Sequence, residues 1–260
     1  MIIIPDIHGR PFWRSAVGGR ENEEIVFLGD YLDPYPKEFI TTPEAIDNFK
    51  DILLFKERHP DNVSLLLGNH DFGYLWSGEI NNSRRNERYR PVIAGLFRSH
   101  FDRFALAHYR KVNGRGFLFS HAGVHAQWLD VAFFPWRESY RPEGLADMLN
   151  RWLHSPGEKE RFLGMYSGYR SFGYRPLPNF GSCVWADLQE WTDEEENIQH
   201  NKLLNLFQIF GHTQQEVEPY VGENFMCIDV RRAFELTEDG IMHDDFHPCC
   251  EITYNLNERS

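Results

Sequence analysis

Residues 2–8 read IIIPDIH, an apolar run closed by a proline and followed by Asp6 and His8. Four further apolar runs end in the same way before a polar residue: EEIVFLG before Asp30, VSLLLG before Asn69 and His70, GFLFS before His121, and LFQIFG before His212. Short runs rich in Ile, Val, Leu and Phe are typical of buried strands. Polar residues just past the carboxyl ends of several strands meet at one sheet edge, where open α/β folds build their sites. The sequence therefore predicts an α/β fold with one site made of Asp, Asn and His.

Helical patterns separate these strands. Thr42 and Pro43 form an N-cap and first-turn pair that predicts a helix ending at Pro60, and apolar spacing predicts two more helices over residues 91–108 and 142–154. The runs FMCIDV (225–230) and CCEITYNL (249–256) indicate closing strands. Because the polar strand ends extend from residue 6 to residue 212, dividing the chain would divide the site, so we expect a single domain over residues 1–260.

Residues 124–185 form a distinct segment, dense in Trp, Tyr, Phe, Arg, Gly and Pro. The segment lies between two strands that carry polar ends, so we expect it to lie beside the site as a cap or as a substrate-selecting insertion. Alternatively, segment 124–185 is a cap that only shields the core. The sequence of the segment is compatible with either role.

The composition restricts the class of partner. The formal net charge of -12 argues against a nucleic-acid surface, which is normally basic, but not against a phosphorylated ligand near bound cations. The chain enters its first strand at Ile2 without a signal-peptide pattern, and no apolar stretch approaches the roughly 20 residues that span a bilayer. The four cysteines show no CxxC spacing or disulfide framework. We therefore expect a cytoplasmic protein that does not bind membranes; its oligomeric state is left open.

Six polar residues at the strand ends offer only nitrogen and oxygen ligands for metal ions: Asp6, His8, Asp30, Asn69, His121 and His212. Asp6 and His8 are two residues apart, so in an extended segment both side chains point to the same side. Asp30 has two acceptor oxygens that suit a bridge between two ions. A site without thiolates suits Mn, Fe, Zn or Co. Two such ions about 3.5–4 Å apart can produce hydroxide from a shared water at neutral pH and hold phosphoryl oxygens in line.

His70 follows Asn69 directly and is therefore close to this predicted metal centre. An imidazole with a pKa near neutrality can protonate an alkoxide leaving group as it departs. Asp33 comes three residues after Asp30 and can accept a hydrogen bond from the other ring nitrogen. We expect His70 to act as general acid and Asp33 to orient it.

The motifs DIHGR, GDYLD, LLGNHD, FSHAG and FGHT, in this order, resemble those of the calcineurin-like metallophosphoesterases. The chain is most similar to the phosphoprotein phosphatase branch, which includes bacterial serine/threonine phosphatases. The resemblance implies two mixed β-sheets packed as a sandwich with helices outside. It also implies that Asp6, His8 and Asp30 hold one ion, and it assigns the other ion to four residues: Asp30, Asn69, His121 and His212.

The chain departs from this branch where the branch has phosphate-binding arginines. The second motif normally continues into Arg-Gly, whereas Pro34 and Tyr35 follow Asp33 here, and Leu67 replaces an arginine before the third motif. A replacement guanidinium that binds phosphate in bidentate fashion would restore the clamp. We expect it to come from Arg170 in GYRSFG or from Arg10, with the pair at 231–232 as a third choice.

The expected function is that of a dinuclear phosphoesterase that hydrolyses phosphomonoesters, with phosphoserine or phosphothreonine in proteins, or a small phosphorylated molecule, as substrate. One alternative keeps the metals but acts on diesters or dinucleoside polyphosphates, with aromatic residues of segment 124–185 stacking on a base. Another alternative is a weakly active binding scaffold. Retained metal ligands favour an enzyme over the scaffold.

Overall fold

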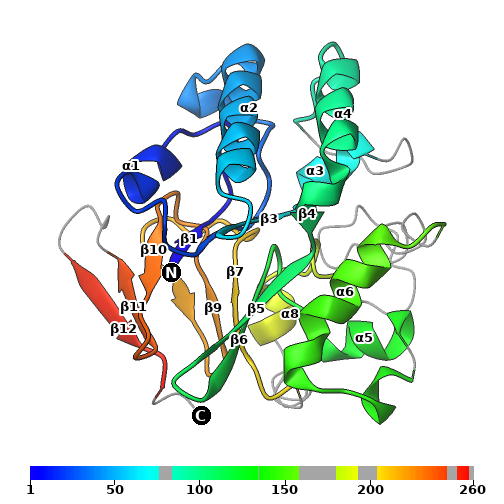
Figure 1. The fold of residues 1–260 in the computed structure, drawn as a ribbon, viewed down its shortest axis with the longest axis vertical. Coiled ribbons are helices and arrows are strands. Elements are labelled where there is room, and N and C mark those ends of the chain that lie inside the picture. The colour runs from blue at the N-terminus through cyan, green and yellow to red at the C-terminus, as the bar shows by residue number, and fades with distance from the viewer. Residues whose placement is uncertain (76–83, 134, 158–179, 193–203, 245–250, 258–260) are drawn as a thin grey trace.

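The computed structural model describes residues 1–75, 84–133, 135–157, 180–192, 204–244 and 251–257. Two mixed β-sheets form its centre (Figure 1). The seven strands of the larger sheet are, in order across the sheet, β12 (Ile252–Asn255), β11 (Ile241–Asp244), β10 (Phe234–Leu236), β1 (Ile2–Ile4), β2 (Ile25–Phe27), β3 (Val63–Leu66) and β4 (Phe104–Ala105). The five strands of the smaller sheet are β5 (Ala107–Val112), β6 (Arg115–Ser120), β7 (Phe207–Phe210), β9 (Phe225–Cys227) and β8 (Tyr220–Val221). The predicted α/β fold with two mixed sheets is confirmed.

Parallel pairing dominates the middle of each sheet. Strands β1, β2, β3 and β4 run parallel, with Ile3 opposite Val26, while β10, β11 and β12 add antiparallel strands. In the smaller sheet β6, β7 and β9 run parallel between the antiparallel edge strands β5 and β8. Because parallel strands end at the same sheet edge, the polar residues that follow them are brought together.

Side chains alternate between two apolar layers along the strands. Ile3 and Val26 face the space between the sheets, where they join Phe119 and Ile209 of the smaller sheet in one core cluster. Ile2 and its alternating neighbours belong to a second cluster that includes residues of the flanking helices. Burial on both faces explains why these strands read as continuous apolar runs rather than alternating ones.

Helices cover the sheets on the outside. They are α1 (Trp13–Val17), α2 (Thr42–Arg58), α3 (Asn69–Leu75), α4 (Arg90–Ser99), α5 (Ala126–Ala132), α6 (Leu145–His154) and α8 (Gln189–Thr192). Figure 1 shows α1, α2 and α4 on the side of β1 to β4, and α5 and α6 beside β5 and β6. Short 3-10 turns occur at Pro36–Glu38, Phe101–Arg103, Trp136–Glu138 and Pro142–Gly144. None of the helices in the described ranges is long and apolar enough to cross a membrane.

The first predicted helix is confirmed, but it begins one residue earlier than expected. Thr41, not Thr42, is the N-cap: its hydroxyl accepts a hydrogen bond from the Glu44 amide, and the Glu44 carboxylate accepts one from the Thr41 amide. This reciprocal arrangement is a capping box, which satisfies two amides that the helix itself leaves unpaired. The predicted helix over residues 142–154 is also confirmed, as a 3-10 turn followed by α6.

The predicted helix over residues 91–108 is wrong beyond Ser99. Phe101 and Phe104 continue the helical spacing of α4, but the chain turns at Phe101–Arg103 and enters β4 and then β5. Strand β5 pairs with β6 through a two-residue turn at Asn113 and Gly114, whose φ angles are 46° and 82°. Asn-Gly is the preferred pair for such a hairpin turn, so pairing with β6 outweighs the local helical pattern.

Candidate metal centre

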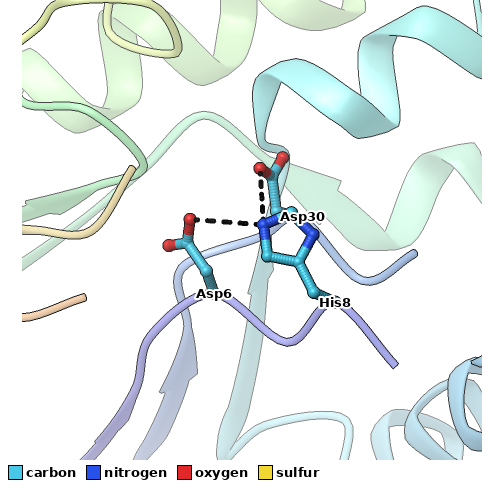
Figure 2. A group of neighbouring side chains, drawn as sticks. All are labelled: Asp6, His8 and Asp30. Atoms are coloured by element: carbon cyan, nitrogen blue, oxygen red, sulfur yellow. Dashed lines mark ion pairs between the residues drawn. The ribbon is translucent and has the colours of Figure 1, made fainter. Parts of the chain in front are cut away.

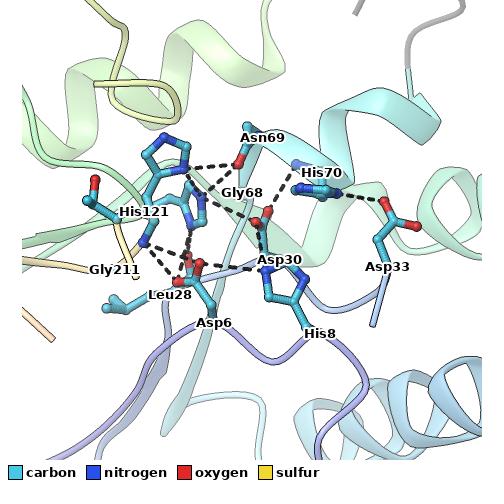
Figure 3. A network of polar contacts seen from close by, with 12 residues as sticks. Asp6, His8, Leu28, Asp30, Asp33, Gly68, Asn69, His70, His121 and Gly211 are labelled. Carbon is cyan, nitrogen blue, oxygen red and sulfur yellow. Dashed lines mark hydrogen bonds and ion pairs between the residues drawn. The ribbon is translucent and has the colours of Figure 1, made fainter. Parts of the chain in front are cut away.

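The residues that follow five strands, three in the larger sheet and two in the smaller, lie close together at one end of the sheets. Asp6 comes after β1, Asp30 after β2 and Asn69 directly after β3 and its glycine, while His121 and His212 come after β6 and β7 of the other sheet. Figure 3 shows Asp6, Asp30, Asn69 and His121 directed toward one another. The structure therefore brings together the six side chains that the sequence placed at strand ends.

The first group of candidate metal ligands, called the first ligand group below, consists of Asp6, His8 and Asp30 (Figure 2). Nε2 of His8 lies 3.9 Å from Oδ2 of Asp6 and 3.5 Å from Oδ2 of Asp30. One ligand atom from each residue falls within 4.8 Å of the others, and all three residues are buried. This spacing leaves room for one metal ion between the three atoms.

The second group of candidate metal ligands, called the second ligand group below, consists of Asn69, His121 and His212. Oδ1 of Asn69 lies 3.1 Å from Nε2 of His121 and 3.2 Å from Nδ1 of His212, and the two nitrogens are 3.2 Å apart. Oδ2 of Asp30 lies 3.6 Å from Nε2 of His121. One carboxylate oxygen of Asp30 therefore lies next to both groups.

The ring orientation of two histidines fits a cation. Nδ1 of His8 donates to the Leu32 carbonyl at 2.8 Å, and Nδ1 of His121 donates to the Leu28 carbonyl at 2.9 Å. A proton on Nδ1 leaves the lone pair of Nε2 directed into the ligand groups, which is the usual second-shell arrangement of metal-binding histidines. Burial lowers the pKa of both imidazoles and so favours the neutral form, which is the form that binds a metal ion.

The two buried carboxylates also fit a cation. Burial and the neighbouring Asp30 raise the pKa of Asp6 to about 8. Burial opposes ionisation of Asp30 as well, but the imidazoles of His121, His70 and His8 outweigh it and lower its pKa to about 2. Two carboxylates this close repel each other unless positive charge lies between them, which a bound metal ion would provide.

Glycines make room for both carboxylates. A Cβ atom on Gly211 would lie 2.1 Å from Oδ1 of Asp6, and one on Gly68 would lie 2.1 Å from Oδ1 of Asp30. Both distances are far below contact distance, so a larger residue at either position would displace a carboxylate. Gly68, which precedes Asn69, and Gly211, which precedes His212, therefore leave the space that the two carboxylates occupy.

The backbone at the site differs from the extended chain that we expected for Asp6 and His8. His8, Asp30, Asp33 and His212 all adopt left-handed conformations, with φ of 42°, 51°, 61° and 65°. Such residues each cost about 1–3 kcal/mol and concentrate at functional sites. Sharp turns after the strands, not strand alternation, direct these side chains inward.

His70 and Asp33 lie in contact, as Figure 3 shows. Nδ1 of His70 is 2.7 Å from Oδ2 of Asp33, and the Tyr74 hydroxyl donates a short hydrogen bond to the other oxygen. Asn69 and His70 form the start of α3, so their side chains diverge by helical rotation. The amide of His70 also donates to Oδ1 of Asp30 at 2.9 Å, which connects this pair to the ligand groups.

Of the two arginines predicted to bind phosphate, the structure describes Arg10. Nε of Arg10 lies 3.0 Å from both oxygens of Glu38, and its Nη1 donates to the Asp6 carbonyl at 3.1 Å. The charge of Arg10 is therefore engaged within the protein. Arg170 lies outside the described residues.

Sequence reasoning missed three side chains next to the site. Asp71 accepts hydrogen bonds from the amides of Asp30, Tyr31 and Gly68, and so holds the two loops together. Arg84 lies beside His70, and the Tyr74 hydroxyl contacts Asp33. Asp71 could have been found as the residue that ends LLGNHD, whereas nothing in the local pattern distinguishes Arg84 from the arginines around it.

Comparison with known families identifies this arrangement. The sequence profile of the calcineurin-like phosphoesterases matches residues 2–216. The chain belongs to this family. The matched region contains all six residues of the two ligand groups, together with His70 and Asp33.

Solved structures of phosphatases share the fold of this calcineurin-like phosphoesterase. A cold-active protein-tyrosine phosphatase of a psychrophilic Shewanella species is 14% identical, with a TM-score of 0.62 over 97% of this chain and 79% of that one. A serine/threonine phosphatase of Saccharomyces cerevisiae is 15% identical, with a TM-score of 0.50 over 100% and 80%. No curated protein matches the sequence. The family supports a metal-dependent phosphoric ester hydrolase, and these distant structures support the fold.

Proposed function

We propose that this calcineurin-like phosphoesterase hydrolyses phosphomonoesters at a centre of two metal ions. The observation that carries the proposal is the position of Asp30, whose Oδ2 lies 3.5 Å from Nε2 of His8 and 3.6 Å from Nε2 of His121. Asp6 and His8 complete one site, and a second set completes the other: Asn69, His121 and His212. The donor set suits Mn, Fe or Zn. Two such ions, when bound, would polarise the phosphoryl group and activate the attacking water.

His70 would supply the proton to the leaving group. Asp33 accepts the hydrogen bond from Nδ1 at 2.7 Å and so fixes the ring with Nε2 on the opposite side. A carboxylate in this position stabilises the protonated imidazole, which must be present before the proton is transferred to the departing alkoxide. The hydrogen bond from Tyr74 holds the Asp33 carboxylate in turn.

The substrate that we propose is a phosphomonoester on serine or threonine of a protein, or on a small molecule. The related structures are described as acting on phosphotyrosine in one case and on phosphoserine or phosphothreonine in the other, so the shared fold leaves the esterified residue open. Trp128 and Trp136 of segment 124–185 are buried in the core and are not available to stack on a base, which leaves the partly exposed Trp185 as the described tryptophan nearest the ligand groups. We therefore place the monoester ahead of the diester or dinucleotide.

We further propose that residues 1–260 form one domain and that segment 124–185 contributes to substrate selection. Helices α5 and α6 pack on the main core through Leu129, Leu149 and Leu153. Trp185, at the end of the segment, lies with its ring centroid 6.0 Å from that of His212. The segment thus connects the core to the edge of the ligand groups.

The test compares hydrolysis of p-nitrophenyl phosphate and bis(p-nitrophenyl) phosphate by one preparation reloaded with Mn²⁺, with chelator-treated protein as control. We expect chelator-sensitive turnover that favours the monoester, followed by activity on phosphoserine and phosphothreonine peptides. Faster hydrolysis of the diester would indicate that the natural substrate is a phosphodiester or a dinucleoside polyphosphate. No turnover of either substrate by metal-loaded protein would favour a binding scaffold.

A further inference from the structure

Pro34 and Tyr35 follow Asp33 where the resembled phosphatases have arginine and glycine, so the side chain of Tyr35 stands at the glycine position. Its ring lies against the first ligand group, with its centroid 5.0 Å from that of His8. Arg84, far along the chain, covers this ring with its guanidinium carbon 3.8 Å from the ring centroid. At this distance a guanidinium stacks on the aromatic face, a contact that stabilises and orients the cation.

Arg84 lies between a metal-ligating candidate and the proposed general acid. Its Nη2 is 3.4 Å from Nε2 of His8 and 3.3 Å from Nε2 of His70. Its Nε donates to the Asp33 carbonyl at 3.0 Å, so this backbone contact and the Tyr35 ring hold the guanidinium without depending on either histidine. The atoms that it contacts on both histidines are those that face the reaction centre and not those that face the backbone or Asp33.

The charge of Arg84 is not balanced by a carboxylate in the described ranges. Arg10 and Arg231, the other arginines near this position, both approach Glu38, at 3.0 Å and 3.8 Å. Among the described residues no Asp or Glu oxygen lies within ion-pair distance of Arg84, which is partly exposed. A cation at the rim of a polar site, stacked on a ring and left without an acidic partner, is suited to an anionic ligand.

We propose that Arg84 binds the phosphoryl oxygens of the substrate and that Tyr35 positions it, which rests on the phosphatase function proposed above. In this arrangement Arg84 replaces the arginine that the second motif lacks, from a different segment of the chain. A guanidinium beside His70 holds the phosphoryl group where the general acid reaches the leaving oxygen. Tyr35 is a positioning residue, because it acts on the substrate only through Arg84.

The test uses metal-loaded full-length protein and orthophosphate as the probe. Arg84→Ala is compared with wild type and with Arg84→Lys, and Arg85→Ala is the matched control, since the neighbouring Arg85 pairs with Glu87. A hydrogen bond to a charged group contributes about 1.5–3 kcal/mol, so we expect Arg84→Ala to weaken competitive inhibition by orthophosphate about 10- to 100-fold. The phosphate-induced rise in Tm should disappear with it, while metal content stays unchanged. Arg84→Lys should recover part of both, and Arg85→Ala should behave as wild type.

Tyr35 variants test the positioning role. Tyr35→Phe keeps the ring and should keep phosphate binding, whereas Tyr35→Leu should raise the KM for p-nitrophenyl phosphate and weaken phosphate inhibition. Added guanidinium ion should raise the turnover of Arg84→Ala but not that of wild type, because it can enter the vacated position.

The outcomes separate this inference from the proposed function. If Arg84→Ala binds orthophosphate as tightly as wild type, the inference is overturned even when wild type is an active phosphatase. If wild type binds orthophosphate through Arg84 but hydrolyses no phosphomonoester, the proposed function fails and the phosphate site stands. Equal behaviour of Tyr35→Leu and Tyr35→Phe would remove Tyr35 from the proposal.

Discussion

The two ligand groups are built in different ways although they share Asp30. The first group comes from residues 6–30 on the adjacent strands β1 and β2, and it contains two carboxylates. The second group requires both sheets, because Asn69 follows β3 of one and His121 and His212 follow strands of the other. Its own ligands are neutral. The first group therefore combines two carboxylates from a short stretch of sequence, whereas the second group forms only when the two sheets pack against each other.

The largest expected effect comes from changing the residue that the two groups share. Asp30→Asn removes the carboxylate next to both sites, so we expect both ions to bind more weakly and chelator-sensitive turnover to fall to the level of metal-free protein. Metal content per chain, measured by mass spectrometry of the dialysed protein, checks this. Asp61→Asn, at an exposed position, is the control. Full occupancy in Asp30→Asn would show that Asp30 is not shared.

A large loss of rate without loss of metal is expected for His70→Asn. Removal of a general acid lowers the rate by about 10²–10⁴-fold. The loss should be greater for phenyl phosphate than for p-nitrophenyl phosphate, because p-nitrophenolate leaves without needing a proton. An equal loss for both substrates would contradict the role as acid.

The charge of the first group predicts how the metal-free protein responds to pH. The folded chain keeps the Asp6 proton up to about pH 8, whereas an unfolded aspartate loses it near pH 4. Between these values the folded state binds more protons, so the free energy of unfolding falls as pH rises, by up to about 1.4 kcal/mol for each pH unit. Asp30 adds no slope there, because its pKa of about 2 leaves it ionised in both states. Urea midpoints at pH 5 and pH 8, after chelation, measure the fall.

Asp6→Asn is the control for this pH dependence, since it removes the contribution of Asp6 and keeps that of Asp71 and Asp229, whose pKa is also raised by burial. Reloading with metal should flatten the response, because a cation stabilises the ionised carboxylate. Because the lowered pKa of the buried His8 and His121 gives a slope of opposite sign below about pH 6.5, the decisive quantity is the difference between wild type and Asp6→Asn. Equal changes of the urea midpoint with pH in the two proteins would contradict the assignment.

The smallest effect compares two glycine substitutions. Gly68→Ala places a Cβ atom 2.1 Å from Oδ1 of Asp30, and overpacking of this kind costs about 1–3 kcal/mol and should weaken metal binding. Gly95→Ala is the matched control, because it lies in α4 with open space around its Cβ position and should stabilise the chain by about 0.4–1 kcal/mol. Chemical denaturation of both variants measures the difference. Equal stability of the two would show that the carboxylate can move aside at no cost.

The ligand groups were predictable because each member stands next to a strong local pattern. An apolar run that ends in glycine, proline or serine identifies a strand end, and the following Asp, Asn or His is then placed at the sheet edge without knowledge of the tertiary structure. The helix predicted over residues 91–108 failed for the opposite reason. Phe101 and Phe104 fit a helical period, and only pairing between β5 and β6 decides that the chain leaves the helix at Ser99.

The sequence by itself determined the family through its five motifs, and the resemblance to that family implied the mixed two-sheet fold. The set of polar residues at the strand ends followed from short apolar periods and from residue types that bind metals. Tertiary structure decided what lies around that set. The left-handed turns that direct His8 and His212 inward, the glycines that admit the carboxylates, and the contact of Arg84 with Tyr35 join residues distant in the chain. The physical reason is that ligand identity is local chemistry, whereas the position of a long, flexible arginine depends on which ring and which carboxylates the folded chain places around it.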